Sequence, residues 1–178
     1  MAYKNGNYIA FVGCGTTDVS KNDRGLFEIV KIWGEEKGFK FVNSHDKTYQ
    51  VKDTSSKETL YSRLRERLNN SKNMVLLVSE KTRKYCSEIL EYELNYGISK
   101  SLPIIVVIKD YDTIKNVDYQ HKRLLPKILE DNLNNIPTLF IPFKKNALKK
   151  ALDEKFDIHN LRLKNDIYIL DIEKESWD

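Results

Sequence analysis

Several carboxylates fall within one short stretch of the sequence, between residues 79 and 94. On a helix, Glu93 lies beside the apolar stripe that contains Ile89 and Leu90, which precede it by four and three residues. Glu91 falls on another face of the same helix and is expected in solvent. A carboxylate at the border of a buried face, near the ligand end of a sheet, suits the stabilisation of positive charge. Glu93 is therefore the first candidate for a catalytic residue, and an ordinary surface glutamate is the alternative.

The loop that follows the first apolar run, residues 13–20, superficially resembles a phosphate-binding loop. It matches neither G-x-G-x-x-G nor G-x-x-x-x-G-K-[ST], because a lysine or third glycine is not at the required place. The alternative is a flexible turn into a helix whose cap is Ser20, Asn22 or Asp23. Cys14 has no histidine near it in the sequence, so we expect a buried cysteine rather than a nucleophile.

His45 and Asp46 are adjacent and follow the second apolar run. A histidine beside an aspartate suggests a metal ligand or an acid–base pair. Adjacent side chains usually point in different directions, however, so a solvated or capping histidine is the alternative. The residue types alone leave both interpretations open.

Five short apolar runs predict strands, because their Val and Ile content and their length are typical of strands buried on both faces. They span residues 8–12, 39–42, 74–78, 104–108 and 138–141. Helical spacing of apolar residues predicts helices between them, near residues 26–37, 57–68, 87–98, 119–131 and 144–156. The second of these begins with a capping box, Ser55 to Glu58.

This alternation predicts an α/β fold with a parallel sheet and helices on both faces. In such sheets, ligands bind beyond the carboxyl ends of the strands, where the strand order reverses. The loops to inspect are residues 13–23, 43–54, 79–88 and 109–118. We expect one domain over residues 1–156 and a short C-terminal extension over 157–178, whose apolar run Ile167 to Leu170 predicts an edge strand or part of a small hairpin.

The composition narrows the class of protein. Lys and Arg number 30 against 26 Asp and Glu, a net charge of only +4, whereas a dedicated nucleic-acid binder shows a larger clustered excess. The two cysteines, Cys14 and Cys86, lack the spacing of a disulfide scaffold or a zinc site and suit a reducing cytosol. An apolar stretch of about 20 residues and a signal peptide are both missing. We therefore expect a cytoplasmic protein that does not bind membranes.

The order and spacing of six segments resemble the Toll/interleukin-1 receptor (TIR) superfamily, and most closely the TIR-like B subunits (ThsB) of the bacterial Thoeris anti-phage system. These segments are residues 41–46, 53–60, 63–72, 75–82, 92–94 and 102–107. The resemblance extends over about residues 8–150. It implies a flavodoxin-like fold with a five-stranded parallel sheet, in agreement with the alternation of elements.

Catalytic members of the superfamily cleave the bond between ribose and nicotinamide in NAD with a glutamate of the third helix, and Glu93 matches that position. NAD is then the substrate, and no cofactor or metal is expected. Thoeris B subunits are thought to make a cyclic ADP-ribose-type signal that diffuses to a separate effector. Many catalytic members carry Trp four residues before the glutamate, where this chain has Ile89.

The resemblance also implies the surroundings of the site. Residues at or just past the first strand are expected to approach the nicotinamide riboside, namely Phe11, Gly13, Thr16 and Asp18. Ser44, His45 and Asp46 begin the loop that gates the site in TIR domains and meets a neighbouring copy. Self-association through TIR–TIR contacts is therefore expected.

Three other functions remain as alternatives. The first is a non-catalytic TIR interaction domain, which Ile89 favours. The second is a nucleoside deoxyribosyltransferase-like enzyme, which also uses a glutamate against an anomeric carbon. The third is nucleic-acid binding by the basic stretch over residues 63–72, which Glu66 interrupts and which more closely resembles a solvated helix face.

Overall fold

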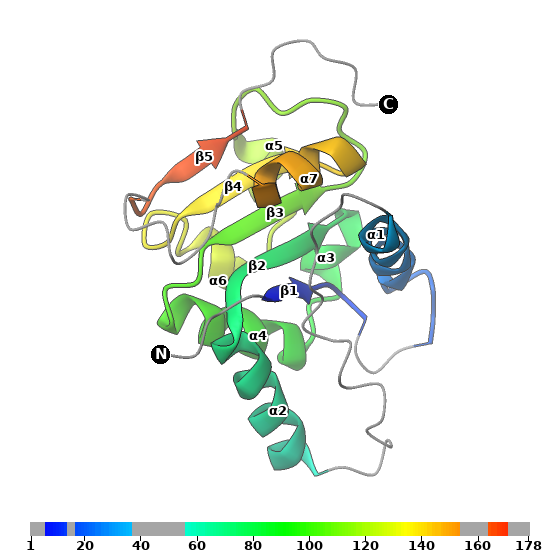
Figure 1. The fold of residues 1–178 in the computed structure, drawn as a ribbon, viewed down its shortest axis with the longest axis vertical. Coiled ribbons are helices and arrows are strands. Elements are labelled where there is room, and N and C mark those ends of the chain that lie inside the picture. Colours follow the sequence, from blue (N-terminus) through cyan, green and yellow to red (C-terminus); the bar gives the residue numbers. More distant parts are fainter. Residues whose placement is uncertain (1–5, 14–16, 37–55, 154–163, 171–178) are drawn as a thin grey trace.

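The computed structural model describes residues 6–13, 17–36, 56–153 and 164–170. Within them, five parallel strands form one sheet whose strand order follows the sequence (Figure 1). The strands are β1 (Gly6–Ala10), β2 (Ser71–Val78), β3 (Ile104–Ile108), β4 (Thr138–Pro142) and β5 (Ile167–Ile169). The predicted α/β fold with a five-stranded parallel sheet is confirmed. The strand expected at 39–42 lies outside the described residues, and the described strands contain no reversal of order.

Apolar side chains on both faces hold the sheet together. All five residues of β3 are buried, as the unbroken run of Ile and Val predicts. In register, Tyr8 of β1 lies beside Met74 of β2, which lies beside Ile104 of β3. Burying one Val or Ile contributes roughly 1.5–3 kcal/mol relative to leaving it exposed, so these central strands form the stable frame of the domain.

Helices cover both faces of this frame (Figure 1). Apolar residues of α1 (Arg24–Glu35) and α7 (Lys145–Asp153) pack on one face. Those of α2 (Lys57–Asn69), α4 (Glu88–Ser99) and α6 (Lys127–Glu130) pack on the other. Two further helices are short: α3 (Glu80–Lys84) follows β2, and α5 (Tyr119–Lys122) precedes α6. We refer to the two sides as the α1 face and the α4 face.

Two predicted helix boundaries were wrong. The cap of α2 is Ser56, whose Oγ accepts a hydrogen bond from the Thr59 amide at 3.3 Å, rather than the predicted Ser55. The single helix predicted over 119–131 is divided into α5 and α6. Pro126 causes the division, because proline lacks an amide hydrogen and disfavours helical geometry in the residue before it.

The C-terminal apolar run forms β5, which pairs in parallel with β4. β5 lies at the edge of the described sheet, so the predicted edge strand is confirmed. Part of the extension over 157–178 thus belongs to the sheet. No helix within the described ranges combines the length and apolarity that a membrane span requires.

Candidate active site

Glu93 is positioned by the way α4 begins and packs. Ser87 caps the helix, its Oγ accepting a hydrogen bond from the Leu90 amide at 3.2 Å. The helix then turns Leu90, Leu94 and Gly97 towards the sheet, and Glu93 lies among them with only 4% of its surface exposed. The sequence predicted a position at the border of the buried face. The structure instead places this carboxylate inside it.

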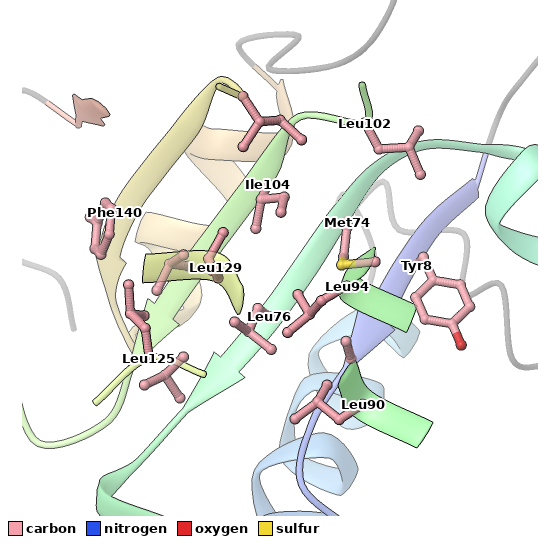
Figure 2. Packing of buried hydrophobic residues seen from close by; sticks show 14 of the residues in the cluster. Tyr8, Met74, Leu76, Leu90, Leu94, Leu102, Ile104, Leu125, Leu129 and Phe140 are labelled. Atoms are coloured by element: carbon pink, nitrogen blue, oxygen red, sulfur yellow. The ribbon is translucent and has the colours of Figure 1, made fainter. Parts of the chain in front are cut away.

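The partner of Glu93 is a tyrosine of the first strand. The Tyr8 hydroxyl donates a hydrogen bond to Glu93 Oε1 at 2.5 Å, and Tyr8 is itself fully buried. Figure 2 shows Tyr8 beside the apolar cluster of Met74, Leu90 and Leu94, with its hydroxyl pointing away from them. A buried phenol requires a hydrogen-bond partner, and the Glu93 carboxyl group supplies one. Tyr8 lies two residues before the end of β1, so Glu93 is below the carboxyl edge of the sheet.

Burial dominates the electrostatics of Glu93. Loss of hydration raises its pKa from 4.5 to about 7, against the opposing effects of the Tyr8 hydrogen bond and the positive charge of Arg67. Arg67 is a half-buried residue of α2, and burial lowers its own pKa. Near neutral pH the Glu93 carboxyl group is therefore present in both protonation states. Perturbed carboxyl groups of this kind are typical of functional sites.

A second buried acid, Asp23, lies at the carboxyl edge itself, just before α1. The Ser79 hydroxyl reaches its two carboxylate oxygens at 2.8 and 3.0 Å, and Thr82 Oγ1 donates to one of them at 3.3 Å. Burial raises the pKa of Asp23, while the Ser79 hydrogen bond opposes that shift. Asp23 is the N-cap residue of α1, one of the three caps suggested from the sequence, but its side chain makes no capping hydrogen bond to the helix.

Lys81 strengthens this connection between the two loops. Its Nζ donates to the carbonyl oxygens of Val19 at 3.0 Å and Asn22 at 3.1 Å. Two of the four loops singled out from the sequence, 13–23 and 79–88, are thus joined at the carboxyl edge. Helix α3, which the sequence did not predict, forms there because Ser79 and Thr82 make a reciprocal capping box.

The sequence profile of a known family, the Thoeris protein ThsB, TIR-like domain, matches residues 8–114 of the chain. The match covers more than half of the chain and includes Tyr8, Asp23, Arg67 and Glu93. The chain belongs to this family. The resemblance found in the sequence is confirmed, and the protein is a TIR protein of anti-phage defence.

In this ThsB TIR-like domain, two of the predicted substrate-contact residues, Phe11 and Gly13, lie on the α1 face of the sheet. Phe11 stacks on Phe27 of α1, with ring centroids 4.8 Å apart. Gly13 allows this arrangement, since a Cβ atom there would lie 2.7 Å from a ring carbon of Phe11. Glu93 lies on the α4 face, so the structure does not bring Phe11 and Glu93 together.

Asp18 lies in an exposed turn of this TIR-like domain. Its carboxylate accepts hydrogen bonds from the Ser20 amide and hydroxyl at 2.9 and 2.6 Å. These bonds hold the pKa of Asp18 below its ordinary value. The predicted residues Thr16, Ser44, His45 and Asp46, and also Cys14, lie outside the described residues.

The remaining residues singled out from the sequence of this ThsB-family domain are Glu91, Ile89 and Cys86. Glu91 is exposed, as expected, and Ile89 is half-buried against the core of the α4 face. Burial raises the pKa of the Cys86 thiol to about 11, which makes it a poor nucleophile. Within the described part of the chain, no group of three or more His, Cys, Asp or Glu residues is arranged to hold a metal. Tyr8 and Asp23 were missed as site residues, and the one available signal was the tyrosine that begins the apolar run 8–12.

Proposed function

We propose that this protein cleaves the nicotinamide–ribose bond of NAD and releases a cyclic ADP-ribose-type signal that activates a separate effector. The observation that carries the proposal is the buried carboxyl group of Glu93 on α4, within the region that matches the ThsB family. Among the described residues, the buried acids are Asp23 and Glu93. The resemblance to catalytic TIR domains, in which Glu93 matches the position of the catalytic glutamate, also supports the proposal.

The reaction suits a single carboxylate. As the bond between the ribose C1′ and the pyridinium nitrogen breaks, its electron pair goes to the nitrogen, and nicotinamide leaves as a neutral molecule. No general acid is needed, and the sugar becomes an oxocarbenium ion. An ionised Glu93 stabilises this charge more strongly in the transition state than in the ground state. Water, or a nucleophilic atom of the same nucleotide, then forms the new bond to C1′ and loses a proton, which gives the linear or the cyclic product.

One experiment tests this function. Purified protein is incubated with NAD at several concentrations, alone and with extract of phage-infected cells, and the products are separated by chromatography. We expect nicotinamide release from the wild type and a loss of about 10²–10³ in rate for Glu93→Gln. The control is Glu91→Gln, the same change at an exposed position of the same helix, and it should retain the wild-type rate. A wild type that releases no nicotinamide under any of these conditions contradicts the proposal.

The alternative is a TIR domain that only assembles with other copies, and one observation favours it. Glu93 is closed off from solvent and paired with Tyr8, so its carboxylate does not contact a substrate in this arrangement. Ile89, in place of the more usual Trp, agrees with that alternative. Self-association without nicotinamide release, measured in the same samples, would support it.

A further inference from the structure

Access to Glu93 is blocked on every side that the structure describes. The sheet side is occupied by Tyr8, and the flanking residues of its own helix, Leu90 and Leu94, are fully buried. Arg67 of α2 is the charged group that faces Glu93 from the neighbouring helix. A ribose ring has no route to the carboxylate unless the side chain, or the helix that carries it, moves.

We propose that Tyr8 is a positioning residue that holds Glu93 in a withdrawn resting state, and that activation requires this hydrogen bond to break. The proposal rests on the proposed NAD-cleaving function and adds its regulation. Tyr8 is suited to the role because it belongs to the central sheet, whereas Glu93 lies on a covering helix. The sheet therefore provides a fixed anchor for a side chain that must move.

Release has two effects that act in the same direction. It brings the carboxylate to solvent, where a substrate can reach it. It also removes the desolvation that holds the pKa of Glu93 near 7, so the group ionises fully at neutral pH. A neutral carboxyl group cannot stabilise a ribosyl cation, so the protonated fraction of the withdrawn state is inactive by charge, and burial makes the whole of that state inactive by geometry.

The strength of the contact suits a switch. A hydrogen bond to an ionisable group shifts an equilibrium between two states by roughly 10-fold to 100-fold. A trigger, or a contact with another copy, that favours the released state by a similar factor would be sufficient to reverse the balance. The opposite role, in which Tyr8 holds Glu93 ready for substrate, predicts that loss of the hydroxyl reduces activity.

The first test measures nicotinamide release by Tyr8→Phe in dilute solution without a trigger. We expect about a 10-fold or larger rise over the wild type, and no release from the Tyr8→Phe, Glu93→Gln double variant. The matched control is Tyr96→Phe, which removes the hydroxyl that donates to Asn69 Oδ1 at 3.1 Å between α4 and α2. Unchanged or reduced activity of Tyr8→Phe, beside a wild type that is active at high concentration, overturns the proposal and leaves the function intact.

The second test does not depend on catalysis. A water-soluble carbodiimide and an amine are used to label accessible carboxyl groups, and peptide mass spectrometry measures the rate at each glutamate. In the wild type we expect Glu93 to react at least about 10-fold more slowly than Glu91 on the same helix. Tyr8→Phe should remove most of this difference, and Tyr96→Phe should not.

The two tests separate the two ideas. Faster labelling of Glu93 in Tyr8→Phe, with no nicotinamide from any variant or condition, supports the withdrawn state and contradicts the enzymatic function. Glu93 labelling as fast as that of Glu91 in the wild type overturns the withdrawn state without any variant. Thermal unfolding of each variant confirms that the comparison is made between folded proteins. If Tyr8→Phe does not fold, the ratio of the Glu93 and Glu91 labelling rates in the wild type decides.

Discussion

Glu93 carries a free-energy cost that its surroundings only partly offset. Its carboxyl group is buried with one phenol and one nearby arginine, and its pKa is raised to about 7 mainly by lost hydration. Burying a charge is unfavourable unless pairing and hydrogen bonds compensate it. A glutamine or leucine at this position would be simpler for the fold. The presence of an acid at this buried position therefore points to a role that requires its charge.

We predict that Glu93 makes stability depend on pH. Between pH 4.5 and about 7 the folded protein keeps a proton on Glu93 that the unfolded chain has released. The free energy of unfolding therefore falls as pH rises through this interval, by up to roughly 3 kcal/mol. Glu93→Gln has no such proton, so it should be more stable than the wild type at pH 8 and closer to it at pH 5.

Chemical denaturation at several pH values measures this difference. Glu91→Gln is the control, because Glu91 is exposed and should not change the slope. Parallel stability curves for the wild type and Glu93→Gln would show that the carboxyl group is not buried in solution as it is here.

Between elements, buried polar side chains join the segments at the carboxyl edge of the sheet. Asp23 immediately precedes α1, and Ser79 immediately follows β2. Lys81 of α3 donates hydrogen bonds to the loop between β1 and α1. These contacts join residues that are 56 to 62 positions apart in the sequence. They fix the end of the loop after β1, which carries the predicted substrate contact Asp18, to the start of α3.

We predict that Ser79→Ala weakens this connection. The change removes the hydroxyl that donates to buried Asp23 and leaves only Thr82 Oγ1 among its side-chain donors in the described residues. Leaving a buried acceptor unsatisfied costs about 1–3 kcal/mol of unfolding free energy. Urea denaturation measures the loss, with Ser62→Ala as the exposed control, for which a change within about 0.5 kcal/mol is expected. Equal stability of the two variants would mean that Asp23 finds other partners.

The strands and helices were largely predictable from the sequence, whereas the side-chain contacts between them were not. Apolar runs identified all five described strands, β5 included, and the pattern of apolar residues identified α4 as the helix of Glu93, because both signals are local. The Tyr8–Glu93 hydrogen bond joins residues 85 positions apart, so no local pattern contains it. The same holds for Asp23, whose place before a helix suggested a cap. Pro126 was a visible signal for the division of α5 from α6, and it was overlooked.

At the scale of the molecule, the α1 face and the α4 face separate the two halves of the expected site. Phe11 belongs to the first and Glu93 to the second, so one copy in this arrangement does not assemble a complete pocket from the described residues. TIR sites are commonly completed across a contact between copies. On the function proposed above, we expect association between copies to be the trigger for the release of Glu93.

We predict that nicotinamide release per molecule rises with protein concentration, because association then supplies the missing part of the site. Turnover is measured over a range of dilutions, with sedimentation in parallel to follow assembly. Glu93→Gln should assemble in the same way and remain inactive. A specific activity that stays constant across the range would show that a single copy suffices.

The short strand β5 affects how the sheet forms during synthesis of the protein. Its three residues, Ile167–Ile169, pair with β4 and are synthesised after it. While the chain is still attached to the ribosome, β4 has its neighbour β3 on one side only, and its other hydrogen-bonding edge is open. Open strand edges are templates for association with other chains. Newly made molecules are therefore most prone to wrong pairing of the β4 edge in the interval between the synthesis of β4 and that of β5.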